Sequence, residues 1–480
     1  MSLVARLLSL FPVREVPAPA PAAPVIVRRA PGGDGFVRSF EGAAGGRRWD
    51  GFTEMHSAPA AILAARPILA RRARGLVANS PHGAAGVEAW ESALVGTGIK
   101  CVSPVAGLGE AFEAWTDDAD ADGLTDFYGL QKLVSRSVAT NGEALVVILP
   151  GMRLRVLDPE QLDTAVLVGP GANRVVHGVE FDAAGRRVAY HVRLEPPGSW
   201  FARVETVRLP AEDVLHVFRP IVPGQVRGLT WFAAALLRFA DYDRATDAQL
   251  QRQLVAALLA GFIVSPDGAG EELAGRASVE GGPPSLEPGT MTVLDPGQDV
   301  RFSEAAPIGA EAIEFLRITA REIAAAIGVP AHVLTGDLTQ ANYSSLRAGL
   351  VEWRRRVEAL QHSMMVFQFC RPVWRRWVTW KALAGDPRFA GFFRDPEAFL
   401  AARWMTPRFD WVDPKKDVEA ELLEIGAGLK SRRQAVAARG YDVEALDAEI
   451  AADREREGRM GLAFVAAPLA APAAPEGGAE

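Results

Sequence analysis

The sequence has 480 residues, of which 49% are hydrophobic and 23% are charged. This composition excludes a largely disordered chain, and the length predicts large buried cores in more than one domain. The 52 basic and 59 acidic side chains give a formal net charge of −7, which excludes a protein that grips phosphates over its whole surface. Any contact with DNA is therefore expected to be local or loose.

The two cysteines, Cys101 and Cys370, lie far apart in the sequence, so we expect core residues and no disulfide framework. The longest apolar run, residues 254–264, is about half of the roughly 20 residues that span a bilayer, so no membrane segment is expected. The first twelve residues lack the proportions of a secretory signal. These features predict a cytosolic product that is later built into a larger assembly.

The expected elements change in character along the chain. Residues 13–35 are rich in Pro, Ala and Gly, which predicts a flexible arm, and the last fifteen residues repeat this composition. Helical spacing dominates residues 55–140. Residues 143–218 contain short β-branched or aromatic runs separated by Gly, Pro and Asp, which is typical of strands.

The next part of the chain predicts an extended helical hairpin. Residues 230–264 contain no internal proline and could form one helix of about 50 Å. A loop-rich insert follows, and then a second helix that Gly328 and Pro330 end. A third helix is expected to begin near Ser344 and to run past Pro372. The apolar residues on one face of the second helix are Ile313, Leu316, Ala320, Ile323 and Ile327.

The sequence contains no recognisable catalytic or metal-binding motif. Its seven histidines lack metal-ligand spacing, and residues 95–100 (VGTGIK) lack the spacing of a phosphate-binding loop. Asp118, Asp120 and Asp122 match the first half of a calcium loop, but Gly129 stands where that loop needs a glutamate. A solvated acidic turn before a helix explains the aspartates better. We therefore expect no catalytic residue, no metal and no cofactor.

Nine local stretches and Trp115, taken in order, carry a resemblance. They include a basic helix ending in an Asn-Ser-Pro turn, a Val-Gly-x-Gly-Ile turn, an Asn-Gly-Glu block, a Gly-Gln-x-Arg-Gly turn, a Gly-Val-Pro block and an Asp-Pro-Lys-Lys block. Between residues 55 and 455 the chain resembles the lambda-like portal proteins of tailed phages. It departs from the family at Ser80, where a second asparagine is common. The stretches are residues 69–81, 95–100, Trp115, 126–136, 141–146, 154–162, 177–192, 215–236, 328–355 and 411–442.

The resemblance implies an α+β portal fold with wing, stem, clip and crown regions, assembled as a ring that usually has twelve subunits around a tunnel. Each region then has a place in the sequence. The assignment is a flexible arm at 1–54, the wing at 55–228, stem helices at 229–264 and 309–328, the clip at 265–308, a tunnel loop at 329–343, a long basic helix and further wing at 344–410, the helical crown at 411–465 and a disordered tail at 466–480.

The resemblance also places two candidate sites. The first is the tunnel loop, whose polar stretch TGDLTQANY has one formal charge; its DNA-facing residues would be Thr335, Asp337, Thr339, Gln340, Asn342 and Tyr343. An ordinary helix–helix connector is the alternative interpretation. The second is the basic third helix, where contacts to DNA or to the next subunit would be made by Arg347, Arg354, Arg355 and Arg356. A solvated helix face is the alternative there.

The function that follows is a non-enzymatic portal at one vertex of the virion capsid, assembled in the bacterial host cytoplasm. The implied partners are other copies of the chain, double-stranded DNA, the terminase large subunit, the major capsid and scaffold or protease proteins, and head-completion proteins of the neck, with no membrane. Two other classes stay open: another structural head or tail component, and a hydrolase that processes DNA. A prophage or gene transfer agent is an alternative setting for the same fold.

Overall fold

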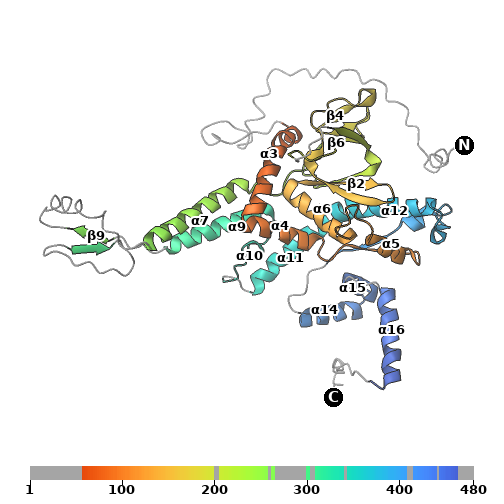
Figure 1. Ribbon diagram of the computed structural model, residues 1–480. Helices are drawn as coiled ribbons and strands as arrows, with labels where there is room; N and C mark the ends of the chain where they lie inside the picture. The colour runs from red at the N-terminus through yellow and green to blue at the C-terminus, as the bar shows by residue number, and fades with distance from the viewer. Residues whose placement is uncertain are drawn as a thin grey trace, which may run out of the picture. The chain divides into compact units, whose positions relative to one another are not determined.

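The computed structural model describes residues 57–198, 205–257, 261–264, 299–302, 309–339, 343–407, 414–439 and 443–462. The predicted arm (1–54) and tail (466–480) lie outside the described residues. So does the predicted clip, except for its residues 299–302. Helices and antiparallel sheets alternate in the described part (Figure 1), which confirms the mixed α+β class. Within these ranges, no helix combines the length and apolar character needed to cross a membrane.

Helices form the first part of the described chain, as the spacing predicted. Pro81 starts one of them, and the Asp126 side chain caps another by accepting a hydrogen bond from the Gly129 N–H. In the acidic turn before that helix, the Asp120 carboxylate accepts hydrogen bonds from the backbone N–H groups of Leu124 and Thr125. The elements are α3 (Ala58–Asn79), α4 (Pro81–Leu94), β1 (Lys100–Val102), α5 (Leu108–Thr116) and α6 (Phe127–Asn141).

Two antiparallel sheets follow, one of three strands in the order β3-β2-β8 and one of four in the order β4-β5-β6-β7. The strands are β2 (Glu143–Leu149), β3 (Arg153–Leu157), β4 (Arg174–Val176), β5 (Val179–Phe181), β6 (Arg187–Arg193), β7 (Thr206–Pro210) and β8 (Val214–Phe218). Successive side chains of a strand point to opposite faces. Leu145 and Val147 of β2 therefore join a small core with the four-stranded sheet, whereas Ala144 and Val146 join the larger helical core.

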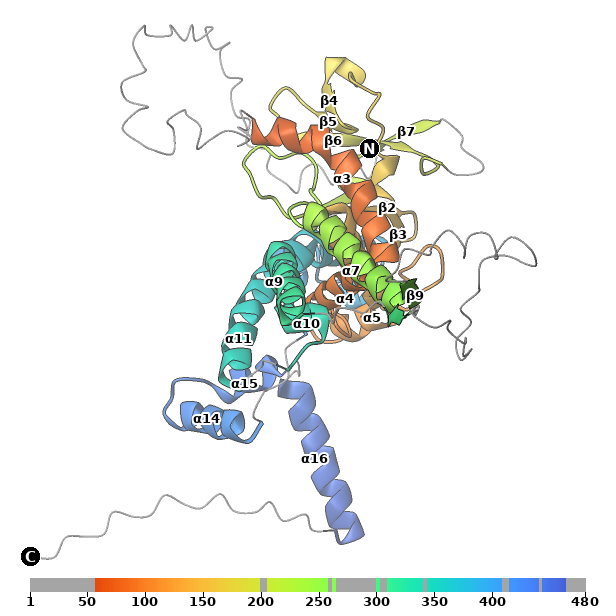
Figure 2. The ribbon, with the colours of Figure 1, turned by 90° about the vertical axis from the view of Figure 1, so that its left-hand side faces the viewer.

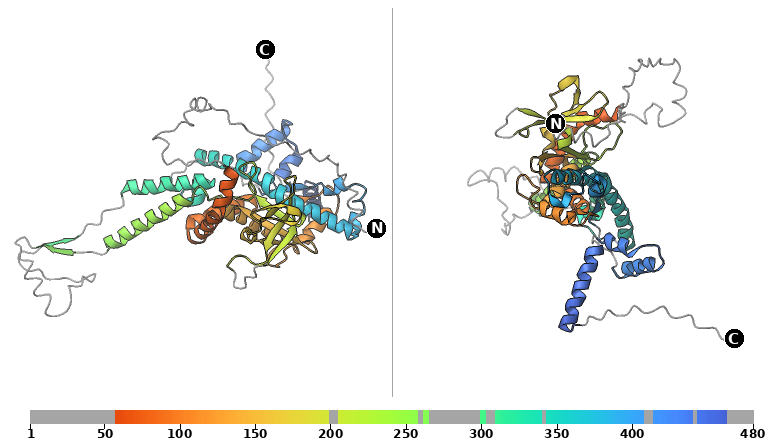
Figure 3. Two further views of the ribbon diagram at one scale, coloured as in Figure 1. Left: turned by 90° about the horizontal axis from the view of Figure 1, so that it is seen from above. Right: turned by 90° about the vertical axis from the view of Figure 1, so that its right-hand side faces the viewer.

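The predicted hairpin is present, but its first helix is shorter than expected. Helix α7 is Leu236–Ala257 and packs beside α9 (Ala310–Ile327), as Figures 1 and 3 show. The single helix expected over 230–264 was therefore wrong at both ends. The chain before α7 forms turns, and β9 (Gly261–Val264) pairs antiparallel with β10 (Asp299–Phe302). The aromatic and β-branched residues of β9 favour a strand.

The third helix is continuous from Tyr343 to Leu383, as predicted, and it passes through a π-helical segment. It consists of α11 (Tyr343–Leu360), the π-helix Gln361–Cys370 and α12 (Arg371–Leu383). Trp374 and Trp377 on α12 are fully buried in the larger core. After α12 come the 3₁₀ turn Pro387–Phe389, α13 (Pro396–Leu400) and β11 (Arg403–Met405), which pairs with β1.

Three helices make up the last described part of the chain (Figure 2): α14 (Pro414–Gly426), α15 (Arg432–Ala438) and α16 (Val443–Met460). The buried Glu421 carboxylate of α14 accepts hydrogen bonds from Lys430 and Arg439, at 2.6 and 2.8 Å. Arg432 of α15 forms an ion pair with Asp447 of α16 at 2.7 Å. The helices expected for this part of the chain are therefore present within residues 414–439 and 443–462.

Candidate functional site

The predicted tunnel loop begins at a short helix between α9 and α11. Gly328, in the left-handed conformation, ends α9, and α10 (Ala331–Thr335) follows at once. Gly336, also left-handed, then ends α10, so the chain turns sharply twice within nine residues. These two turns place Asp337 and Thr339 beside α9.

Local hydrogen bonds order the described part of the loop. The Asp337 carboxylate accepts hydrogen bonds from the backbone N–H of Thr339 at 2.9 Å and from its hydroxyl at 2.6 Å. The Thr335 hydroxyl accepts the Asp337 N–H at 3.2 Å and donates to the Ala331 carbonyl at 2.9 Å. Three of the predicted site residues are therefore brought together in one compact turn.

Arg317 of α9 neutralises this turn. Its Nε atom lies 3.5 Å from the Asp337 carboxylate, and its Nη2 donates to the Thr339 hydroxyl at 3.4 Å. The hydrogen bonds from Thr339, and then the charge of Arg317, hold the pKa of Asp337 below its usual value. Asp337 is the only formal charge that the sequence predicted for the loop. Its pairing with Arg317 leaves this turn polar and without net charge.

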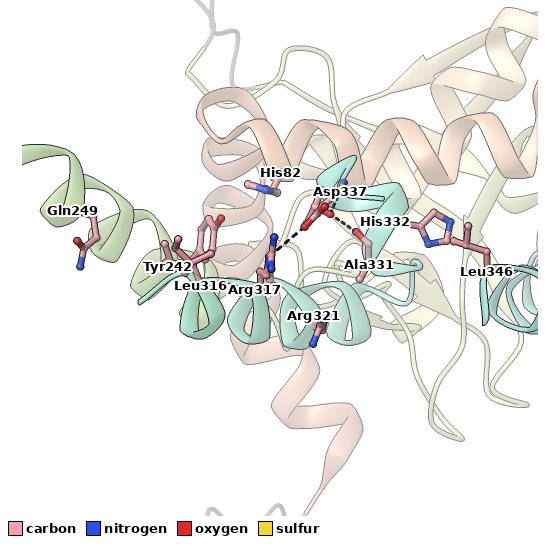
Figure 4. Close-up of a pocket in the computed structure, with 13 residues that line it drawn as sticks. His82, Tyr242, Gln249, Leu316, Arg317, Arg321, Ala331, His332, Asp337 and Leu346 are labelled. Carbon is pink, nitrogen blue, oxygen red and sulfur yellow. Dashed lines mark hydrogen bonds and ion pairs between the residues drawn. The ribbon is translucent and has the colours of Figure 1, made fainter. Parts of the chain in front are cut away.

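A cavity of about 470 Å³ lies beside the turn, lined by α4, α7, α9, α10 and α11 (Figure 4). The His82 ring packs edge-on against Tyr242, with centroids 5.2 Å apart. Burial lowers the pKa values of His82 and His332, so neither adds a positive charge at neutral pH. The cationic groups that line the cavity are therefore the arginines of α9, Arg317 and Arg321.

The predicted arginines of the third helix do not form one uniform patch. Arg356 donates to the Gly328 carbonyl at 3.2 Å and lies 3.6 Å from Glu352, so it binds the C-terminal end of α9. A cation is favourable at that end of a helix. Arg347 and Arg355 are exposed, while Arg354 is half-buried. Seven residues separate Arg347 from Arg354, which places these two on the same side of α11.

Three predicted loop residues follow Thr339: Gln340, Asn342 and Tyr343. Tyr343 is the first residue of α11, and its side chain is not among those described. Gln340 and Asn342 lie outside the described residues. Sequence reasoning missed Arg317, because nothing in its position on α9 signals a pairing with a carboxylate twenty residues later. It also missed His82 and Tyr242, which lie on separate helices of the cavity wall.

Outside the loop, a buried cluster of charged side chains around Glu143 is the strongest candidate for a catalytic site. The Glu143 carboxylate is fully buried and accepts the Gly228 N–H at 2.7 Å and a hydrogen bond from Arg227 Nε at 2.9 Å. His216 Nε2 lies 2.9 Å from it and Arg66 Nη2 lies 2.6 Å from it. Burial alone would raise the pKa of Glu143, but Arg227 and Arg66 hold it well below its usual value.

This cluster stabilises the fold and is not a catalytic site. All four partners surround one carboxylate that has no exposed surface, so no substrate atom can approach it. It joins α3, β2, β8 and the turn at residues 224–228, and so it unites the Asn-Gly-Glu and Gly-Gln-x-Arg-Gly blocks. In the described ranges, no group of three or more His, Cys, Asp or Glu side chains is arranged to hold a metal ion.

Comparison with known proteins then gives the class and the family. A family model described as phage portal protein, lambda family, matches residues 45–361. The class is therefore the phage portal proteins, which are structural components and not enzymes. Because this match spans about two thirds of the sequence, the chain belongs to the lambda family of phage portal proteins.

Individual relatives are more distant. The chain is 26% identical over 371 residues to a probable portal protein of Halomonas phage phiHAP-1, covering 74% of this chain and 71% of that protein. It is 25% identical over 502 residues to the portal protein of Escherichia phage N15, covering 89% and 92%. Portal protein B of Escherichia phage lambda is 26% identical, with 64% of this chain and 62% of that protein covered.

Solved structures are similar at lower identity. A chain from the virion of a native gene transfer agent particle matches with a TM-score of 0.44 and 18% identity, covering 84% of this chain and 94% of that chain. A portal protein of the HK97 phage family from Corynebacterium diphtheriae matches with a TM-score of 0.28 and 16% identity, covering 57% and 82%.

Proposed function

We propose that this protein forms a homo-oligomeric ring, of twelve copies as is usual in the family, at one vertex of a capsid, and that double-stranded DNA passes through its central channel. The observation that carries the proposal is the family match over residues 45–361. In this proposal the terminase, the capsid and scaffold or protease proteins, and the head-completion proteins dock on the ring, which assembles in the host cytoplasm.

The exposed apolar side chains of the helical hairpin support the ring. On α7, Leu250 and Leu254 are 58% and 52% exposed, and on α9 Phe315 is 61% exposed. Exposed apolar side chains gathered on one feature mark a surface that another chain covers. A head-to-tail contact between two different faces closes into a ring when the rotation allows it. In the proposed assembly α7 and α9 belong to the stem, residues 265–308 are the clip, residues 55–228 the wing and residues 411–465 the crown.

The chemistry of the loop fits a channel through which DNA slides. Lysine or arginine clusters facing the bore would bind phosphates strongly and hold the duplex. The described turn instead offers hydroxyl groups and a carboxylate that Arg317 neutralises. Thr335, Asp337, Thr339, Gln340, Asn342 and Tyr343 are therefore proposed to face the DNA. Arg347, Arg354, Arg355 and Arg356 are proposed to contact phosphates or the next subunit; Arg356 also donates to the Gly328 carbonyl of its own chain.

Electron microscopy of the purified full-length protein tests the proposal. The expected result is a population of closed rings with a central opening wide enough for a duplex, and a particle mass that is an integral multiple of 51.4 kDa. Mass measurement on the same sample gives the number of subunits. A protein that stays monomeric at every concentration, also together with its capsid and scaffold proteins, would contradict the ring.

A further inference from the structure

A second cavity, of about 270 Å³, is lined by residues of α5 and α12, among others. Figure 1 labels both helices. Trp115 of α5 forms part of its wall, and the small residues Ala111, Ala114 and Gly151 leave the space open. The Trp115 ring is held in place by neighbouring rings, with Phe112 and Phe127 at centroid distances of 5.1 and 5.5 Å. The Trp115 side of the cavity is therefore apolar and closely packed, while charged side chains supply much of the remaining lining.

Three cations surround the opening, and two of them are already paired. Arg388 makes two hydrogen bonds with Asp386, at 3.0 and 2.7 Å. Arg153 Nη2 lies 3.6 Å from Asp118. Lys381 instead lies over the Trp380 ring, 5.0 Å from its centroid. Its charge also contributes to lowering the pKa of Asp386, the hydrogen-bond partner of Arg388, so three cations share two carboxylates.

The cavity therefore has one positive charge in excess, on an otherwise acidic protein. Two carboxylates face three cations at its rim, and the surrounding residues 371–403 contain seven basic and three acidic side chains. The whole chain has a formal net charge of −7. An anion that approaches this face is attracted locally, although the protein as a whole repels it.

Size and charge together select the kind of anion. Pockets that take whole small molecules have volumes of about 300–1,000 Å³, so this cavity suits one side chain better than a nucleotide. An excess of a single positive charge suits a monoanion, and Asp118 and Asp386 would repel the second charge of a phosphate. The methylene groups of an acidic side chain would lie against Trp115.

From this geometry we infer that the cavity is a socket for one aspartate or glutamate side chain of an acidic segment of a partner protein. An anchoring side chain in a small, preformed pocket is the usual centre of a protein–protein contact. Lys381 supplies the positive charge in excess, and the pairs Arg388–Asp386 and Arg153–Asp118 lie at the rim. This inference depends neither on the proposed ring nor on the DNA channel.

Selection from a library of random twelve-residue peptides, with the immobilised full-length protein, tests the socket. We expect enrichment of peptides with a shared Asp or Glu, and binding that weakens as salt is raised. A Lys381→Glu variant should bind the selected peptide at least tenfold more weakly, and a Lys381→Met variant should show a similar loss while keeping the contact with Trp380. Lys100→Glu, at an exposed lysine on β1, is the matched control and should leave binding unchanged.

Three outcomes would overturn the inference. One is that replacing the shared Glu of the selected peptide by Gln does not weaken binding. Another is that the Lys381 variants bind like the wild type while retaining its melting temperature. A third is that inorganic phosphate, or a 20-base-pair duplex, competes for the cavity better than acetate or the peptide does, which would assign the cavity to phosphate groups.

Discussion

Glu143 of β2 binds groups from three other segments that are far apart in the sequence. Arg66 comes from α3, His216 from β8, and Arg227 and Gly228 from the turn before α7. Removal of one partner from a buried ion pair typically costs 3–5 kcal/mol, because the remaining charge is left without compensation. The cluster therefore specifies how the helical part and the sheets join. The Asn-Gly-Glu and Gly-Gln-x-Arg-Gly blocks look like separate motifs in the sequence, and the cluster explains why both are present.

His216 makes the stability of this region depend on pH. Burial lowers its pKa from 6.5 to about 4, against the opposing effect of the hydrogen bond with Glu143. In the unfolded chain the imidazole binds a proton near pH 6.5, while in the folded chain it does not until about pH 4. The free energy of unfolding is therefore highest above pH 6.5 and falls as pH decreases towards 4. The loss from this one group is on the order of 3 kcal/mol.

Urea unfolding of the wild type and of His216→Gln at several pH values between 7.5 and 4.5 measures this contribution. The wild type should lose more stability across the window than the variant does, while His362→Gln, at an exposed position of the π-helix, should follow the wild type. Burial also lowers the pKa values of His82, His177 and His332, so some pH dependence persists in every variant. Parallel curves for the wild type and His216→Gln would refute the assignment to His216.

At the scale of elements, the end of α9 depends on the left-handed conformation of Gly328. Its φ is +80°, and an added Cβ would lie 2.8 Å from Arg356 Nη1 and 3.4 Å from the Trp90 ring. Gly328→Ala is therefore expected to lower the free energy of unfolding by at least about 1–2 kcal/mol. It should also loosen the contact between α9 and α11, because Arg356 donates to the Gly328 carbonyl.

Denaturant unfolding of Gly328→Ala beside Gly75→Ala separates the two effects of an added methyl group. Gly75 lies inside α3, with open space around the position of its Cβ, so alanine there should be neutral or stabilise by up to about 1 kcal/mol. If both variants were stabilised, the left-handed turn would not be required at residue 328.

The sequence predicted those elements whose ends have local signals. Helix α9 ends at Gly328, as expected, and α6 begins after the capping Asp126. The first hairpin helix was predicted too long, because its limits come from contacts between distant residues. An added Cβ on Gly228 would lie only 2.1 Å from the Gly142 carbonyl oxygen, so close packing holds the chain that leads into α7.

Strand β7 (Thr206–Pro210) lies within the predicted strand region, but no local signal marks its ends, since it is short and ends in proline. Its pairing with β6 is a tertiary contact. For the site, composition predicted a polar loop with a single charge. The partner of that charge, Arg317, follows from how α9 and α10 pack, and no spacing in the sequence encodes it. The same is true of Arg356, whose contact with the end of α9 distinguishes it from its two arginine neighbours.

At the scale of the whole molecule, the helical hairpin leaves apolar side chains without cover from its own chain. Ile318 of α9 is 47% exposed and Leu237 of α7 is 71% exposed, in addition to the residues of the proposed stem surface, Leu250, Leu254 and Phe315. The larger core in contrast buries Trp90 and Trp377 almost completely, at 1% and 0% exposure. A chain that buries its core tryptophans but leaves the apolar side chains of the hairpin exposed is suited to association through the hairpin.

The double variant Leu250→Asp and Phe315→Asp tests whether this surface joins the subunits. Charges placed in an apolar contact would lose their hydration without gaining a partner, which costs several kcal/mol at every interface of the ring. We expect the variant to remain monomeric by native mass spectrometry, at concentrations where the wild type assembles. Its far-ultraviolet circular dichroism and melting temperature should match those of the wild-type monomer, since both positions are exposed in the single chain.

Leu167→Asp is the matched control for this variant. Leu167 is 69% exposed, but it lies in the sheet region between β3 and β4, away from the hairpin in the sequence. A variant with aspartate there should assemble like the wild type. If the hairpin variant also assembled normally, the subunits would join through other surfaces, and the apolar side chains of α7 and α9 would need a different partner. If both variants failed to assemble, the effect would come from added negative charge and not from the hairpin.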